Sequence, residues 1–433
     1  MSRSTIIPTF FRSSLLSRRH CASVLRPPNL LGSISRVYEP SAAAGRIGIH
    51  PNLSHLSLPA FALRAFSTSP AKNSTPAPFT YSISASYSDK RQNLDLSRNI
   101  FSFDPSSRKS SASAHAEAEE PRPRVQSGQD AFFISSIGET NNVAFGVVDG
   151  VGGWEESGVD PADFAHSLCD YMADAALRYP HGFDKVSRGQ LLQPVDLLDI
   201  GYDQVMADPA IPAGGCTACI ATASSNGLLN VANLGDSGYI HLSPFRLNFL
   251  SPAQTHRFNT PFQLSKLPKK MLEQVALFGG AKPYSEVPSD SALTQQTLEH
   301  GDVLVFATDG VWDNLSAEDA LRLVTRIMVQ LKAWVLPEEG APGVSPDFVD
   351  IVRNATLKVP ASPGSASADA SVKGLSAVLA TAITHEAKAA SLDTKRDGPF
   401  AKEVQRLYPD ENWKGGKADD ICTIVAVVTQ EGR

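Results

Sequence analysis

The stretch VVDGVGGWEE, residues 147–156, runs an apolar pair directly into a carboxylate and then into glycines. Val147 and Val148 have the β-branched side chains of a buried strand, and Asp149 follows them with no polar transition. The glycines behind Asp149 leave the backbone free for unusual angles and close approach. Alone, the pattern also fits an ordinary strand and turn, so the rest of the chain must decide its meaning.

Aspartate recurs beside other apolar strands of the chain. ANLGDSG places Asp236 after a buried run, VLVFATDGVWDN places Asp309 after another, and GGKADDICTIVAVV places Asp419 before the last one. Asp130 directly precedes AFFIS. Buried carboxylates are costly, and several together repel one another unless a cation neutralises them. Oxygen donors without nearby His or Cys ligands indicate Mg²⁺ or Mn²⁺ rather than Zn²⁺.

The segments around these aspartates alternate between strand hairpins and separate helices. Residues 79–88 alternate in polarity and predict a half-buried strand, and residues 131–148 predict a hairpin. Asp160 and Ser316 are expected helix N-caps. Helices are predicted over residues 158–179, 194–208, 316–334 and 373–390, and a closing strand over 421–428. Because strands and helices do not alternate one by one, we expect an α+β fold.

Composition narrows the class of protein. The 433-residue chain is 42% hydrophobic and 19% charged, which is typical of a globular core. After residue 88 it carries 30 basic and 44 acidic residues, so nucleic acid is not an expected partner. No stretch of about 18 apolar residues predicts a transmembrane span. Five cysteines are too few for a disulfide framework, so we expect reduced thiols. We also expect a monomer.

The N-terminal segment differs from the rest of the chain. Residues 1–88 hold nine basic residues and one acid, and residues 1–70 are rich in Arg and Ser. This composition predicts a cleaved, mostly disordered mitochondrial transit peptide over residues 1–70, with processing close to RAFSTSP, residues 64–70, and a matrix location. A basic tail without a targeting role is the alternative. Residues 79–430 then form the folded domain, with loose polar or Pro- and Ala-rich insertions at 89–127 and 337–372.

Four motifs in order resemble the metal-dependent protein phosphatases, the PPM or protein phosphatase 2C family. They are GQDAFF, VVDGVGGW, GGCTACI…ANLGDSG together with ATDGVWDN, and KADDICTIV. The resemblance covers residues 79–430, and FNTPFQLS at 258–265 and GGKADD are similar to its mitochondrial branch. It implies a four-layer α-β-β-α sandwich of two antiparallel sheets flanked by helix pairs, with the metals at one end.

The same resemblance implies a metal centre made of carboxylates and one backbone carbonyl group: Asp149, Gly150, Asp309, Asp419, Asp236 and Asp130. Asp149 would bridge two Mn²⁺ or Mg²⁺ ions, and Gly150 would offer its carbonyl oxygen. Asp309 and Asp419 would complete the first site and, with Asp149, form the catalytic set. Asp236 with Asp309 matches a weaker third-metal position of the family. Asp130 belongs to the Glu-Asp pair of the second site.

The implied activity is that of a protein serine/threonine phosphatase acting on mitochondrial phosphoproteins. A water bridging the two metals would attack the phosphorus, so no catalytic cysteine is expected. Two alternatives stay open at this point. One is a catalytically dead phosphatase fold that binds phosphoproteins as a scaffold, and the other is a metal-dependent hydrolase of small phosphate esters.

The chain departs from the family pattern at three positions. Gln129 stands where many members have the Glu of the Glu-Asp pair, and Val151 stands where many have a histidine. Val125 occupies the position of a phosphate-binding arginine. Arg257 or Lys417 is therefore the expected phosphate or substrate contact.

Overall fold

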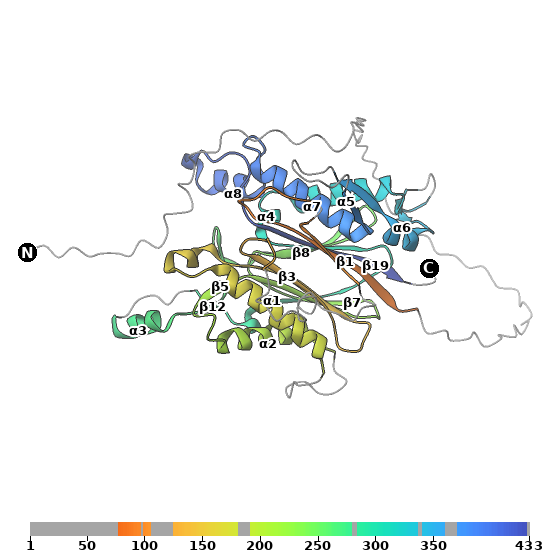
Figure 1. Ribbon diagram of the computed structural model, residues 1–433. Coiled ribbons are helices and arrows are strands. Elements are labelled where there is room, and N and C mark those ends of the chain that lie inside the picture. The colour runs from red at the N-terminus through yellow and green to blue at the C-terminus, as the bar shows by residue number, and fades with distance from the viewer. Residues whose placement is uncertain are drawn as a thin grey trace, which may run out of the picture. The chain divides into compact units, whose positions relative to one another are not determined.

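The computed structural model describes residues 77–96, 98–104, 124–180, 191–278, 284–336, 340–359 and 370–430 (Figure 1). These residues belong to one compact unit, residues 73–433. The predicted transit peptide lies outside the described residues. Among the described residues, every helix is too short or too polar to cross a membrane.

Two antiparallel sheets form the centre of the unit. The first has the order β2 (Ile100–Phe103), β1 (Phe79–Ser88), β19 (Ile421–Gln430), β14 (Val303–Ala307), β8 (Gly238–Ser243) and β9 (Arg246–Leu250). The second has the order β13 (Ala292–Thr297), β7 (Leu228–Leu234), β6 (Ala218–Ala223), β4 (Val143–Asp149) and β3 (Asp130–Ser136). The predicted hairpin is β3–β4, in which Asp130 pairs with Asp149.

Aromatic residues fill the space between the sheets. Phe145 of β4 meets Phe306 of β14 edge to face, with ring centroids 5.1 Å apart. Tyr239 of β8 stacks on Phe306 at 4.9 Å. All three side chains are buried, and aromatic pairs of this kind stabilise a core beyond the burial of their area. The contact fixes the distance between the two sheets.

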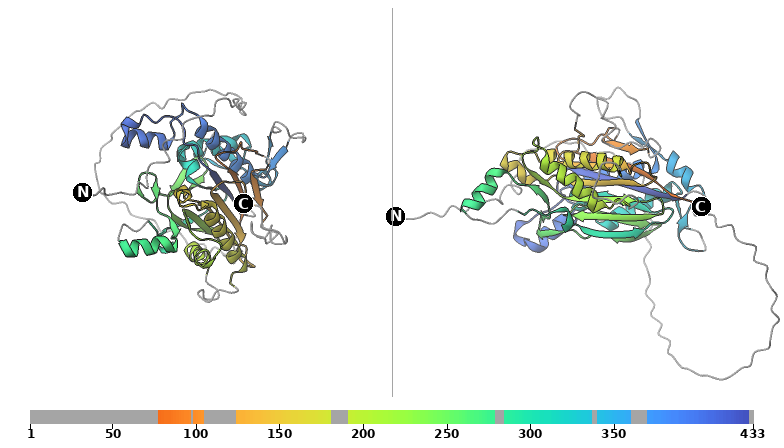
Figure 2. Two further views of the ribbon diagram at one scale, coloured as in Figure 1. Left: turned by 60° about the vertical axis from the view of Figure 1, so that its left-hand side comes forward. Right: turned by 90° about the horizontal axis from the view of Figure 1, so that it is seen from below.

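Helices cover the two outer faces, as the views in Figures 1 and 2 show. α1 (Pro161–Arg178) and α2 (Pro194–Ala207) pack on the five-stranded sheet. α5 (Ala317–Gln330) and α7 (Leu375–Leu392) pack on the six-stranded sheet. The predicted N-caps are confirmed, because Asp160 accepts a hydrogen bond from the Ala162 amide and Ser316 forms a capping box with Asp319. The expected four-layer α-β-β-α sandwich is confirmed.

Two expectations from the sequence are wrong. The helix predicted over 316–334 ends at Gln330, because Lys332 adopts a left-handed backbone conformation (φ 58°) and Trp334 belongs to a short strand. The insertions at 89–127 and 337–372 are not loose throughout. Their described residues include β2, β16 (Gly343–Val344), α6 (Phe348–Asn354), β17 (Thr356–Val359) and the start of β18 (Ala370–Lys373). Buried Phe348 and Val352 pack α6 against the core. The apolar pattern of this seven-residue helix is too short to predict a helix from the sequence.

Smaller elements complete the unit. They are η3 (Gly152–Ser157), β5 (Gly214–Cys216), β10 (Thr255–Arg257), β11 (Thr260–Pro261), β12 (Leu264–Lys266), α3 (Lys269–Phe278), η4 (Pro288–Asp290), α4 (Asp309–Trp312), β15 (Trp334–Val335), α8 (Pro399–Leu407) and η5 (Pro409–Glu411). α3 projects from the body of the unit beside β12 (Figures 1 and 2).

The packing between the sheets gives a test of stability. Phe145→Ala should lower the free energy of unfolding by about 3–5 kcal/mol, because it removes a buried ring and leaves a cavity against Phe306. Leu293→Ala on β13 is the control, since Leu293 is 61% exposed and its loss should change little. Urea denaturation followed by circular dichroism measures both. Equal effects of the two substitutions would contradict the assigned core.

Candidate active site

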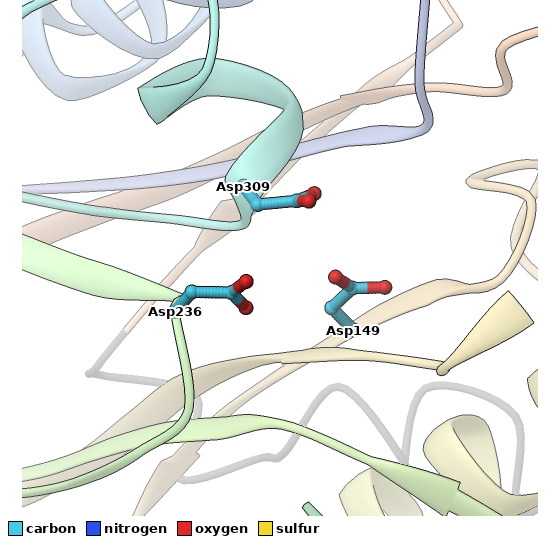
Figure 3. Close-up of side chains that lie close together, drawn as sticks. All are labelled: Asp149, Asp236 and Asp309. Atoms are coloured by element: carbon cyan, nitrogen blue, oxygen red, sulfur yellow. The ribbon is translucent and has the colours of Figure 1, made fainter. Parts of the chain in front are cut away.

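Aspartates from both sheets converge at one end of the sandwich (Figure 3). Asp149 ends β4, Asp236 lies in the turn between β7 and β8, and Asp309 begins α4 directly after β14. One carboxylate oxygen from each of these three residues lies within 4.8 Å of the other two. Asp419 precedes β19, the neighbour of β14. The structure thus brings together aspartates that are far apart in the sequence.

A glycine makes room beside the first of these carboxylates. A Cβ atom at Gly150 would lie 2.8 Å from the carbonyl oxygen of Gln129 and 2.9 Å from that of Pro161. Only glycine fits such a close approach of three backbone segments. The amide of Gly150 donates to the Gln129 carbonyl oxygen, which holds the turn against β3. The glycine after Asp149 is therefore a packing requirement as well as a means of turning the chain.

The carboxylates perturb one another strongly. Burial, followed by the charge of Asp309, raises the pKa of Asp149 well above its usual range. Burial and Asp309 likewise raise the pKa of Asp236 to about 7. The Oδ1 atom of Asp236 is buried and has no hydrogen-bond partner within the described part of the chain. A set of oxygen donors with one buried oxygen unpaired is suited to a hard divalent cation.

Asp130 lies deeper than the other predicted site residues. It is 1% exposed, and its Oδ2 accepts a hydrogen bond of 2.8 Å from the Thr308 hydroxyl. The same hydroxyl oxygen accepts from the Cys422 amide at 3.0 Å. Burial and the neighbouring Asp420 raise the pKa of Asp130 well above its usual range. Thr308 therefore ties this carboxylate to β14 and β19 across the two sheets.

Asp420 has a different environment from its neighbour Asp419. Its two oxygens accept the amides of Lys90 at 2.6 Å and Gln129 at 2.8 Å. A Cβ atom at Gly128, whose φ is 72°, would lie 2.3 Å from the Asp420 carboxyl carbon. Asp420 is thus an anchor for two loops, and Asp419 is the member of the pair that faces the other site aspartates through Lys417.

Sequence reasoning missed Asp313 and the contacts of Lys417. The Lys417 Nζ lies 2.7 Å from Asp309 Oδ2, 2.5 Å from Asp313 Oδ2 and 3.1 Å from Asp419 Oδ2. Asp313 stands four residues after Asp309, immediately after α4, so both carboxylates lie on the same side of the helical turn. The four-residue spacing of the two aspartates in DGVWDN could have predicted that Asp313 lies beside Asp309. Lys417 was expected to contact phosphate, and the structure instead surrounds its ammonium with carboxylates.

A basic loop beside the site was also missed. Lys90 and Arg91 follow β1, and the Lys90 Nζ lies 3.9 Å from Asp419 Oδ1. Lys388 of α7 donates to the carbonyl oxygens of Asp89 at 2.8 Å and Lys90 at 3.2 Å, which fixes the loop. Arg91 lies 3.9 Å from Glu155. Lys90 and Arg91 lie within residues 89–127, whose polar composition had predicted a solvated insertion.

Gln129, one of the departures from the family pattern, contacts a carboxylate. The side-chain amide of Gln129 donates to Glu155 Oε1 at 2.5 Å, so a carboxylate lies beside this position even though Gln129 is neutral. Arg124 forms ion pairs with Asp160 and Asp163 at the start of α1. Arg257 is exposed on β10. The arginine next to Val125 in the sequence, Arg124, is thus paired with carboxylates of α1 and its N-cap.

Comparison with known proteins identifies relatives along most of the chain. No family model matches the sequence. "Protein phosphatase 2C homolog 7, mitochondrial" from Saccharomyces cerevisiae is 30% identical over 305 residues, which cover 70% of this chain and 75% of that protein. "Protein phosphatase PTC7 homolog fig" from Drosophila willistoni is 28% identical over 302 residues, covering 70% and 77% respectively.

Among solved structures, the "photosystem II phosphatase PBCP" matches with a TM-score of 0.46 and 22% identity, over 69% of this chain and 91% of that one. The identity to the Saccharomyces cerevisiae protein extends over more than two thirds of both sequences. The chain therefore belongs to the protein phosphatase 2C family and is a protein phosphatase.

Proposed function

We propose that this chain hydrolyses phosphoserine and phosphothreonine in mitochondrial phosphoproteins with the help of divalent metal ions. The observation that carries the proposal is the group formed by Asp149, Asp236 and Asp309, with carboxylate oxygens within 4.8 Å of one another. The unpaired buried oxygen of Asp236 adds to it. Packing alone offers no compensation for placing these charges together.

The residues present fit Mn²⁺ or Mg²⁺, because every donor is an oxygen atom. Asp149, Asp309 and Asp419 would be the catalytic ligands, and the Gly150 carbonyl oxygen and Asp130 would serve a second ion. Asp236 stands at the position that the family resemblance gives to a weaker third ion, and the proposed activity needs only the first two. When bound, a pair of such ions supplies a bridging water of lowered pKa and neutralises the phosphoryl oxygens.

In this proposal, the basic side chains that bind the substrate phosphate belong to the loop after β1. Lys90 lies beside Asp419, and the Lys388 hydrogen bonds hold its backbone in place. Its ammonium could bind a phosphoryl oxygen while the aspartates orient the reacting centre. Arg91 stands next in the same loop and would extend the positive surface. Arg257, exposed on β10, is a further candidate for contact with the protein substrate.

A mitochondrial location is supported by two independent features. One is the Saccharomyces cerevisiae relative, whose name describes it as mitochondrial, and the other is the acid-poor, Arg- and Ser-rich composition of residues 1–70. The matrix is the proposed compartment. N-terminal sequencing of the native protein should find a start near Ser67, and an intact Met1 or Ser2 would contradict a cleaved transit peptide.

Removal of one proposed ligand charge tests the activity. Asp309→Asn should reduce Mn²⁺-dependent hydrolysis of a phosphothreonine peptide by at least about 100-fold, because the metal centre loses an anionic oxygen. The fold should persist, since the substitution relieves repulsion among the carboxylates. Asp350→Asn on the exposed side of α6 is the matched control and should retain full activity. Near wild-type turnover of Asp309→Asn at limiting Mn²⁺ would remove Asp309 from the site.

The wild-type protein itself distinguishes the alternatives. Hydrolysis of the phosphopeptide with Mn²⁺, and none after chelation, is the expected result. Binding of the phosphopeptide without turnover would indicate a scaffold. Turnover of a small aryl phosphate alone would indicate a hydrolase of small esters.

The assignment of Lys90 has its own test. Lys90→Met should lower kcat/KM for the phosphopeptide about 10- to 100-fold, because a charge-assisted contact to phosphate contributes about 1.5–3 kcal/mol. Inorganic phosphate should also become a weaker product inhibitor of this variant. Lys358→Met, an exposed lysine on β17, is the matched control. An unchanged phosphate inhibition constant in Lys90→Met would show that the phosphate is bound elsewhere.

A further inference from the structure

Lys417 carries a cation into the centre of the aspartate cluster. Its side chain is only 15% exposed, and its Nζ is within hydrogen-bond distance of Asp309, Asp313 and Asp419. The ammonium donates hydrogen bonds to Asp309 and Asp313, and Asp419 lies within ion-pair distance of it. Carboxylates therefore surround this ammonium on three sides, and we do not assign it to a phosphate group.

Both ends of this lysine are held in place. The buried Asn314 side chain accepts from the Lys417 amide at 3.0 Å and donates to the Lys417 carbonyl oxygen at 2.9 Å. The same side-chain amide donates to the Gly310 carbonyl oxygen, one residue after Asp309. The Lys417 Nζ also lies 5.1 Å from the ring centroid of Phe400. The geometry is that of a fixed cation rather than of a mobile surface lysine.

The carboxylates around the ammonium overlap those of the proposed metal centre. Asp309 and Asp419 are proposed ligands of the first ion, and the Asp313 carboxylate lies against the same ammonium. Burial raises the pKa of Asp313 to about 8, the Lys417 ammonium opposes the rise, and Asp309 adds to it. The positive charge of Lys417 also opposes the rise in the pKa of Asp236. Asp236 with Asp309 is the position that the family resemblance gives to a weaker third ion.

We propose that the Lys417 ammonium is a tethered cation that takes the place of a third metal ion between Asp309 and Asp313. The inference rests on the proposed metal-dependent function and specifies the number of ions. A divalent cation between Asp309 and Asp313 would lie against the ammonium that already binds Asp309 Oδ2 and Asp313 Oδ2, and like-charge repulsion disfavours it there, whereas the other oxygen of Asp309 stays available to the first ion. Without divalent ions, the same ammonium holds Asp309 and Asp419 together and offsets their repulsion.

The test counts bound metal ions. Lys417→Met keeps an unbranched side chain beside Phe400 and removes the charge. Wild-type protein should bind two Mn²⁺ ions per chain, measured by equilibrium dialysis and by electron paramagnetic resonance of free Mn²⁺. Lys417→Met should bind a third, weaker ion, and its metal-free form should melt several degrees below the wild type. Lys417→Arg should keep two ions, and Lys358→Met on β17 should match the wild type in every measurement.

A double substitution locates the added ion. Lys417→Met combined with Asp313→Asn should return the count to two, because the new site loses a carboxylate. Three ions in the wild type, or two in Lys417→Met, would overturn the proposal. If metal-free Lys417→Met is unfolded, Mn²⁺ should restore the fold by replacing the lost charge. Failure of Mn²⁺ to do so would also overturn it.

These outcomes differ from a failure of the proposed function. A wild-type protein that binds no Mn²⁺ would contradict the metal-dependent activity itself. A wild-type protein that binds two ions and hydrolyses the phosphopeptide, together with a Lys417→Met variant that gains no ion, would contradict only the role of Lys417.

Discussion

Repulsion among carboxylates is the constraint on which this structure depends. Seven aspartates gather at one end of the sandwich: Asp130, Asp149, Asp236, Asp309, Asp313, Asp419 and Asp420. Burial raises the pKa of several of them, which shows how unfavourable their ionised forms are together. Lys417 and Lys90 neutralise part of this charge from within the chain. The negative charge that these lysines leave uncompensated favours the binding of divalent cations. The repulsion among the carboxylates is therefore also the source of the expected metal affinity.

The sandwich holds these groups in place because each comes from a different strand end. Asp149 ends β4 of the five-stranded sheet, and Asp236 lies in the turn from β7 of that sheet to β8 of the other. Asp309 follows β14 and Asp419 precedes β19, both strands of the six-stranded sheet. The site therefore spans the interface between the sheets, and the rings packed between them set its width. Hydrogen bonds from Thr308 and to Asp420 join the loops at the same end. A shift of one sheet against the other would separate the ligands, so the core and the site are mechanically coupled.

The local part of this arrangement could be predicted from the sequence. A strand that runs into Asp-Gly is a short-range pattern, and it occurs at Asp149 and again at Asp309. The partners of Lys90 could not be predicted, because its amide bonds to Asp420 330 residues away and the surrounding composition resembles a solvated loop. Lys417 was recognised as a site residue but with a phosphate partner, since sequence gives no direction to a side chain. The end of α5 was misplaced because the left-handed Lys332 has no glycine signal.

The position of β19 has a consequence for biosynthesis. This strand, residues 421–430, lies between β1 and β14 in the middle of the six-stranded sheet, and it pairs with β1 along its whole length. The sheet therefore cannot close while the ribosome still holds the last strand, and Asp419 has no fixed place until it does. Pairing between segments so distant in sequence also makes folding slow. The aspartate cluster is thus incomplete until β19 has been synthesised and has paired with β1 and β14.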